Sequence, residues 1–185
     1  MTKAKTRITI LACVAAPFAT MAPAVALADT VINVQLQDPS SDAHPADMKI
    51  LLDHSVVTAG KVTLHAVNES KRLPHEVLVF KDGVDPLPYN ENNGRLVEKQ
   101  MKSLGEISDL GPGDTGEKSF TLAPGTYLLL CNQANHMKAG MFARLKVVAA
   151  GTAITDDKPT AAMMVMPKTK AVKVDASKDD DDDGS

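Results

Sequence analysis

One short segment of the chain combines three side chains that are good ligands for a soft metal ion. Cys131, His136 and Met141 follow one another at intervals of five residues, between two apolar stretches. A thiolate and a thioether are soft donors and an imidazole is a borderline one, so this set favours Cu(I) and tolerates Cu(II). Zinc would accept the cysteine and the histidine but gains little from the thioether. The spacing therefore predicts a metal site, with copper as the preferred ion.

A fourth ligand has to come from elsewhere in the chain, and His75 is the leading candidate because it opens an apolar stretch. Two other histidines, His44 and His54, stand in predicted loops. His65 lies opposite the more apolar face of its predicted strand. Two imidazoles and a thiolate in a plane, with a weak axial methionine, form the blue-copper sites that transfer electrons.

The first 28 residues have the pattern of a secretory signal peptide. They contain three cations and no acid, then an apolar stretch from Ile8 to Met21, then Ala26-Leu27-Ala28 as a small-residue cleavage site. We expect cleavage after Ala28 and export to the periplasm.

The remaining 157 residues carry 17 Lys and Arg against 23 Asp and Glu, a formal charge of −6. That balance excludes a nucleic-acid binder that relies on net basicity.

Export leaves Cys131 as a lone cysteine, because Cys13 belongs to the predicted signal. Such a cysteine is an inert buried thiol, a link between two chains, or a metal thiolate. A Cys–His nucleophile would also need an orienting group and an oxyanion hole, which the sequence does not indicate. Met141 alone would be a core residue, but in register with Cys131 and His136 it favours the ligand interpretation.

The rest of the exported chain predicts β structure around these residues. Short apolar or alternating stretches separated by Gly and Pro turns indicate an all-β antiparallel sandwich with little helix. The stretches 76–80 and 126–131 are too apolar for strands with one wet face, so we expect them to be central. The predicted strands are 31–36, 61–68, 76–80, 119–122, 126–131 and 142–148.

Two segments depart from this pattern. Residues 82–110 begin with turn residues and continue into a helix-friendly stretch at 95–102, which predicts an excursion from the sandwich that carries a short helix. Residues 151–185 show no helix or strand period and include the run Asp179 to Asp183, which predicts a disordered acidic tail. Within that tail, 163–166 is predicted to be a small apolar patch that touches the domain, with soft-metal binding as the alternative.

The motif as a whole resembles the cupredoxins, the family of blue type 1 copper proteins. The resemblance rests on Pro-Gly-x-Tyr-x₃-Cys-x₄-His-x₄-Met over residues 124–141, and on Leu-Pro-His-Glu-Val over 73–77 with Asn68 upstream. The spacings are similar to those of the rusticyanin-like and auracyanin-like members. The resemblance covers roughly residues 48–148 and implies a Greek-key β-sandwich over 29–150 that binds one copper ion. Carried over to this chain, the implied ligands are His75, Cys131, His136 and Met141.

Two positions differ from what the resemblance leads us to expect. Ala134 and Asn135 stand where Pro and Gly usually precede the second histidine. We expect Asn135 to adopt the left-handed conformation and the loop to be less stiff. Glu76 follows the first histidine in place of an asparagine that ties the two ligand loops together. Its backbone N–H is expected to reach the Cys131 sulfur.

These features predict an exported electron carrier that is not itself an enzyme. Copper would cycle between Cu(I) and Cu(II), and His136 would be the electron port to a redox protein such as a cytochrome. Met137 and Ala139 beside it are expected to form an apolar docking patch. The alternative is a copper-binding protein for resistance, storage or delivery, with a copper donor or acceptor as its partner. We expect a monomer with no nucleic-acid partner and no stable membrane insertion.

Overall fold

The computed structural model describes residues 29–39 and 47–173, and nearly all regular structure in them is β. The predicted signal peptide 1–28, His44 and residues 174–185 lie outside the described residues. The strands are β1 (Thr30–Gln37), β2 (Lys49–Leu52), β3 (Val56–Thr58), β4 (Gly60–Asn68), β5 (His75–Lys81), β6 (Leu87–Asn90), β7 (Arg95–Leu96), β8 (Ser103–Leu110), β9 (Thr115–Leu122), β10 (Gly125–Leu130), β11 (Phe142–Val148) and β12 (Thr169–Ala171).

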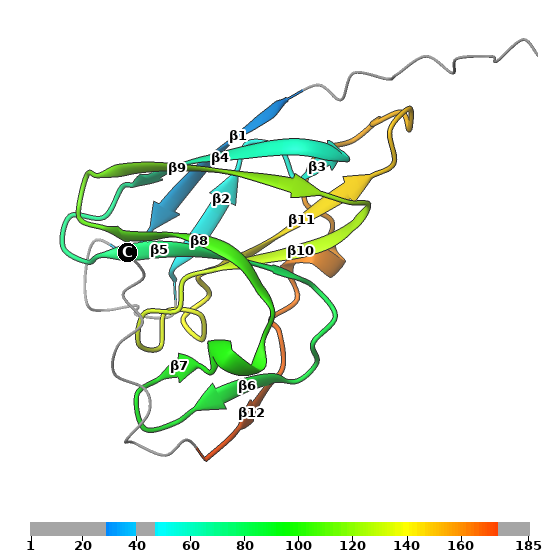
Figure 1. The fold of residues 1–185 in the computed structure, drawn as a ribbon. Coiled ribbons are helices and arrows are strands. Elements are labelled where there is room, and N and C mark those ends of the chain that lie inside the picture. The colour runs from blue at the N-terminus through cyan, green and yellow to red at the C-terminus, as the bar shows by residue number, and fades with distance from the viewer. Residues whose placement is uncertain (1–28, 40–46, 174–185) are drawn as a thin grey trace, which may run out of the picture.

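Two sheets form the sandwich that the sequence predicts (Figure 1). One has the strand order β2-β1-β4-β9 and the other β3-β11-β10-β5-β8. The sheets are mixed, which corrects the expectation of a purely antiparallel sandwich, because β1 pairs in parallel with β4 and β3 in parallel with β11. The chain crosses to the second sheet for β3 and then returns for β4. It therefore arrives beside β1 running in the same direction.

Alternating side chains of the first sheet fill the space between the layers. Ile32, Val34 and Leu36 on β1 are completely buried, and the residues between them are exposed. Val62 and Leu64 continue the same core from β4, as the sequence alternation predicts. Removing each such side chain from water contributes about 1.5–3 kcal/mol, which makes this alternation the main local reason for the strand register.

The strands β5 and β10 are central, as predicted, and they are buried on both faces. Val77 and Val79 point into the sandwich core. Leu78 and Phe80, the residues that alternate with them, belong to a second apolar cluster on the outer face of the same sheet. Leu128 and Leu130 join that second cluster from β10. The continuous apolar stretches in the sequence are therefore explained by two separate cores.

A small third sheet covers the second cluster, with the order β12-β6-β7 (Figure 1, bottom). Two of its strands, β6 and β7, come from the predicted excursion, but the predicted helix at 95–102 is wrong. Residues 95–96 form β7, and only Glu98–Gln100 form one turn of 3₁₀ helix. The excursion also ends earlier than predicted, because 103–110 is the strand β8, which pairs with β5. Pairing with neighbours therefore overrides the local helix propensity here.

The chain beyond residue 150 differs from the expected disordered tail over residues 151–173. It forms a 3₁₀ turn, Ala161–Met164, and then β12, which pairs in parallel with β6. The guanidinium of Arg144 donates hydrogen bonds to the carbonyls of Met163 and Val165, which fixes this segment to β11. Ordered structure therefore continues past the predicted boundary at residue 150 and includes β12.

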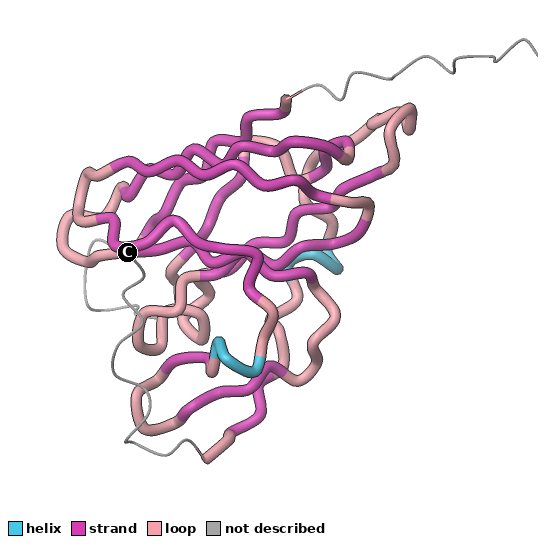
Figure 2. The backbone as a smooth tube through the Cα atoms, in the orientation of Figure 1, coloured by secondary structure: helices cyan, strands magenta, loops and turns pink. Residues whose placement is uncertain are grey.

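In the described residues, helical structure is confined to the two 3₁₀ segments, drawn in cyan in Figure 2. Within residues 29–39 and 47–173, no helix is long and apolar enough to cross a membrane.

Candidate metal centre

Three of the predicted ligands meet at one end of the sandwich. His75, Cys131 and His136 each offer one ligand atom, and these atoms lie within 4.8 Å of one another. The Cys131 sulfur is 3.4 Å from Nδ1 of His136 and 4.0 Å from Nδ1 of His75. The two Nδ1 atoms are 3.2 Å apart, which is close enough for a hydrogen bond between the rings when one of the two nitrogens carries a proton. Both Nδ1 atoms and the sulfur therefore point into the same space.

His75 is held by the loop that precedes β5. The side chain of Asn68, fully buried at the end of β4, donates to the carbonyls of Leu73 and Leu110 at 2.9 and 2.8 Å. Its oxygen accepts the backbone N–H of Ser70. Three hydrogen bonds from one buried amide thus fix the turn that delivers His75 to the site.

The loop after β10 brings the other ligands together by closing on itself. The backbone N–H of Cys131 donates to the carbonyl of Met141, and the N–H of Met141 donates to the carbonyl of His136. Asn135 has φ +66°, the left-handed conformation expected from the sequence. A non-glycine residue adopts this conformation at low cost mainly when it is Asn or Asp.

Met141 is the third residue of the Cys-x₄-His-x₄-Met motif, the one expected from the sequence to be the axial ligand. Its main chain is tied to Cys131 and His136 by the two hydrogen bonds just described. Its side chain is completely buried, in the same apolar cluster as Cys131. A thioether bound to the ion would be the soft fourth donor that distinguishes a copper site from a zinc site.

Burial controls the chemistry of the sulfur. It raises the pKa of the Cys131 thiol to about 12, because an anion in an apolar surrounding loses its hydration. The backbone N–H groups of Glu76 and Gln133 oppose this rise, since both donate toward the sulfur. The contact of the Glu76 N–H with the sulfur is the one expected from the sequence.

Burial has the opposite effect on the two imidazoles. It lowers the pKa of His136 to about 4, with a further contribution from the neighbouring His75. Burial also lowers the pKa of His75, against the opposing influence of the carboxylate of Asp38. Neutral imidazole is the form that binds a metal, so both rings are in the ligating form at neutral pH.

The segment that carries His75 and the loop that carries Cys131 are connected, but Glu76 makes the connection in place of the expected asparagine. The Glu76 carboxyl accepts a hydrogen bond from the backbone N–H of Asn132, next to Cys131. Burial, followed by the nearby Glu98 and Glu106, raises the pKa of Glu76 to about 7. The glutamate therefore connects β5 to the ligand loop, as the asparagine expected at this position would.

The third sheet supports the ligand loop from outside. The side-chain oxygen of Asn132 accepts a hydrogen bond from the backbone N–H of Leu96 at 2.6 Å. Its side-chain nitrogen donates a hydrogen bond to the carbonyl of Leu96 at 3.1 Å. The N–H of Asn135 donates to the carbonyl of Gly94, and the hydroxyl of Tyr89 donates to the Asn135 side chain at 2.6 Å. These contacts oppose the loss of stiffness expected from the missing Pro and Gly.

Close packing explains why Gly94 is a glycine. A Cβ at this position would lie 2.7–2.9 Å from the side-chain amide of Asn135, and the residue has φ +73°. Both conditions exclude larger residues unless the loop moves. The strand turn between β6 and β7 is thus fitted to the ligand loop.

The remaining histidines of the described chain are not part of the site. His54 is exposed and pairs with the carboxylate of Asp157. His65 is half-buried in β4, opposite Glu117 of β9. Sequence reasoning missed the role of Asp38, whose carboxylate oxygen lies 3.7 Å from Nε2 of His75.

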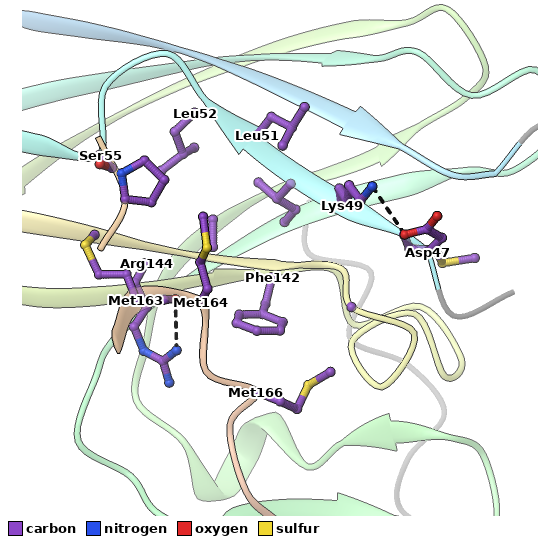
Figure 3. Close-up of a pocket in the computed structure, with 15 residues that line it drawn as sticks. Asp47, Lys49, Leu51, Leu52, Ser55, Phe142, Arg144, Met163, Met164 and Met166 are labelled. Carbon is purple, nitrogen blue, oxygen red and sulfur yellow. Dashed lines mark hydrogen bonds and ion pairs between the residues drawn. The ribbon is translucent and has the colours of Figure 1, made fainter. Parts of the chain in front are cut away.

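A separate pocket of about 450 Å³ lies between β2, β11 and the chain after residue 158 (Figure 3). Met163, Met164 and Met166 line it, and it extends to Gly140 at the end of the ligand loop. Met163 is buried, whereas Met164 and Met166 are 64% and 44% exposed. This confirms that 163–166 forms an apolar patch in contact with the domain.

Comparisons with known proteins agree with the fold. The sequence matches no protein-family model and no curated protein sequence. Among solved structures, rusticyanin from Thiobacillus ferrooxidans is similar at a TM-score of 0.50 and 14% identity, over 65% of this chain and 77% of that one. This similarity supports the cupredoxin resemblance at the level of the fold.

Two auracyanins are similar at lower TM-scores. The reduced auracyanin of Roseiflexus castenholzii has a TM-score of 0.44 and 22% identity, over 64% of this chain and 96% of that one. Auracyanin A of Chloroflexus aurantiacus, a "blue" copper protein, has a TM-score of 0.46 and 22% identity, over 65% of this chain and all of that one.

Proposed function

We propose that this chain is an exported type 1 copper protein that binds one copper ion and shuttles single electrons between redox partners. The observation that carries the proposal is the convergence of one cysteine sulfur and two imidazole nitrogens within 4.8 Å. His75, Cys131 and His136 would hold the ion in a plane, and Met141 would be the weak axial ligand. The fully buried thioether of Met141 fits this role.

The ion would supply a one-electron couple between Cu(I) and Cu(II), and the chain's contribution is to keep the ligands in place. Hydrogen bonds from Asn68 and Asn132 fix the two segments that carry the ligands. Three of the four side chains are completely buried, which excludes water from the site. A ligand set that is already assembled has little to rearrange when an electron arrives, and this favours rapid transfer.

His136 is the proposed electron port, because it is half-buried whereas the other three ligands are completely buried. Ala134 and Asn135 are exposed beside it, and Ala139 is half-buried. Met137 is 3% exposed and packs in the second apolar cluster, so the expected docking patch does not include it. A redox protein such as a cytochrome would approach this end of the sandwich, in the periplasm.

The alternative is a protein for copper resistance, storage or delivery. The observation that favours it is the pair of exposed thioethers, Met164 and Met166, over a pocket that extends to Gly140. Thioethers on a surface are suited to capture Cu(I), the soft oxidation state. The same four buried ligands would serve either function.

An exchange experiment separates the two functions. Copper-loaded protein is mixed alternately with reduced and with oxidised periplasmic-type cytochrome c, and in parallel with a Cu(I) chelator of known affinity. An electron carrier is reduced and reoxidised over many cycles and retains one copper per chain. Copper that passes to the chelator at a rate comparable to cytochrome oxidation would contradict the carrier function and support delivery. The double variant M164L/M166L tests whether the exposed thioethers take part in that transfer.

A further inference from the structure

The alternation of β1 places a charged residue where the core would be expected. Ile32, Val34 and Leu36 point inward and are completely buried. Asp38 is the next residue of the same parity, and its side chain is only 3% exposed. Burying a carboxylate is costly unless a partner compensates, so its position calls for a specific contact.

The atom that Asp38 faces is the outer nitrogen of a proposed copper ligand. Its carboxylate oxygen lies 3.7 Å from Nε2 of His75. This Nε2 is buried and has no hydrogen-bond partner in the structure, while Nδ1 of the same ring faces the Cys131 sulfur. A small rotation of either side chain would bring the two atoms to hydrogen-bond distance.

The end of β1 is fixed to the loop that precedes β5. This attachment holds Asp38 next to His75. The carbonyl of Leu36 accepts a hydrogen bond from the backbone N–H of Glu69 at 2.9 Å. The side-chain amide of Gln37 donates a hydrogen bond to the Glu69 carboxylate at 2.7 Å. The loop from Asn68 to Pro74 then leads directly to His75. The contact between Asp38 and His75 is therefore built by two anchored segments.

We infer that Asp38 is a positioning residue that accepts a hydrogen bond from the Nε2–H of His75. This inference rests on the proposed function. The bond fixes the ring tautomer, because a proton held on Nε2 leaves the lone pair of Nδ1 free for the metal. It also fixes the ring orientation and increases the basicity of the ligating nitrogen.

The carboxylate also changes the charge balance around the ion. The thiolate of Cys131 and the carboxylate of Asp38 together carry two negative charges, which match Cu(II) and exceed the charge of Cu(I) by one. In a site closed to water, this difference favours the oxidised ion. Replacing Asp38 by a neutral residue should therefore raise the reduction potential.

Two substitutions separate the hydrogen bond from the charge. In D38N the amide oxygen still accepts from Nε2–H, so the tautomer stays the same while the potential rises. In D38L both effects are lost, and Cu(II) affinity should fall by about 10- to 100-fold, the range typical for loss of such a partner. The control is D47N, which removes an exposed carboxylate paired with Lys49 and should change neither property.

The first readout is nitrogen NMR of the copper-free protein, which reports the tautomer of His75 without any metal. The inference predicts a proton on Nε2 in the unmodified protein and in D38N, and a mixed population in D38L. A proton on Nδ1 in the unmodified protein would overturn it. Identical potentials and copper affinities in D38N, D38L and the unmodified protein would also overturn it.

The two proposals fail in different ways. If the unmodified protein forms no blue copper site, the proposed function is wrong, and the NMR readout still decides whether Asp38 holds the His75 tautomer. If the blue site forms and the Asp38 variants match the unmodified protein, the proposed function stands and the role of Asp38 is refuted. Circular dichroism of each variant confirms that the sandwich is folded.

Discussion

At the scale of single residues, the burial of Cys131 determines how metal binding depends on pH. Its thiol has a pKa of about 12, so it is protonated at neutral pH in the metal-free protein. The pKa values of His75 and His136 are lowered by burial, so these rings carry no extra proton there. Since a metal binds the thiolate, one proton has to leave when copper enters.

We therefore predict that copper binding releases one proton per ion between about pH 8 and pH 10, above the pKa of about 7 of the neighbouring Glu76 carboxyl and below that of the Cys131 thiol. Affinity should rise about tenfold for each pH unit in that range, because each unit lowers the proton concentration tenfold. Below the lowered pKa values of the histidines, further protons compete and the dependence becomes steeper. Titration in weakly buffered indicator dye measures the release. A release of zero protons, or an equal release in C131S, would contradict this account.

The residue scale is also where sequence reasoning succeeds most fully. The sequence predicts that Cys131, His136 and Met141 lie near one another because all three belong to one short loop, and main-chain hydrogen bonds close that loop locally. His75 is found because it begins an apolar strand. Asp38 is missed although its parity with Leu36 is visible in the sequence, because the partner that justifies its burial is 37 residues away.

At the scale of elements, the ligand loop is supported by β7 rather than by its own residues. Asn132 is 3% exposed and makes hydrogen bonds to both backbone groups of Leu96 and to the carboxylate of Glu98. This pairing also explains why 95–102 is not the predicted helix. The backbone groups of Leu96 that a helix would use are engaged by a side chain 36 residues away, which no local pattern reveals.

Replacing Asn132 by alanine should therefore destabilise the protein. N132A leaves the buried N–H of Leu96 without its acceptor, at a cost of about 1–3 kcal/mol in the free energy of unfolding. Urea unfolding of the metal-free protein measures this. The matched control is Q133A, the adjacent residue, whose exposed bond to Arg95 should contribute at most about 0.5 kcal/mol. Equal stabilities of N132A and Q133A would refute the supporting role of β7.

At the scale of the whole molecule, one sheet separates two apolar cores. The sandwich core is predictable because alternation in β1 and β4 shows which face is inward. The second core is predictable only in part: the apolar excess of β5 and β10 indicates that something covers their outer face. The third sheet, which includes β12, covers this face. The strand β12 pairs with β6, some 80 residues earlier in the chain, and its sequence shows no alternation of apolar and polar residues.

Ending the chain at residue 150 should test whether that last segment is part of the fold. The truncation removes β12 from β6 and takes Met163 away from Arg144, so Leu87, now 2% exposed, loses its cover. We expect the free energy of unfolding to fall by about 2–4 kcal/mol, the scale of one or two uncovered apolar side chains. A chain ending at Lys173 is the control and should be as stable as the full chain. If both truncated chains unfold alike, the segment is not structural.

The central claim is that the Cys131 thiolate and two imidazoles bind a single copper ion. The most direct test is the visible absorption spectrum and electron paramagnetic resonance of the copper-loaded protein, recorded beside C131S with circular dichroism as the control for folding. We predict one copper per chain, an intense thiolate-to-copper band and a blue-copper resonance signal, all lost in a folded C131S. A C131S protein that keeps the colour would contradict the account.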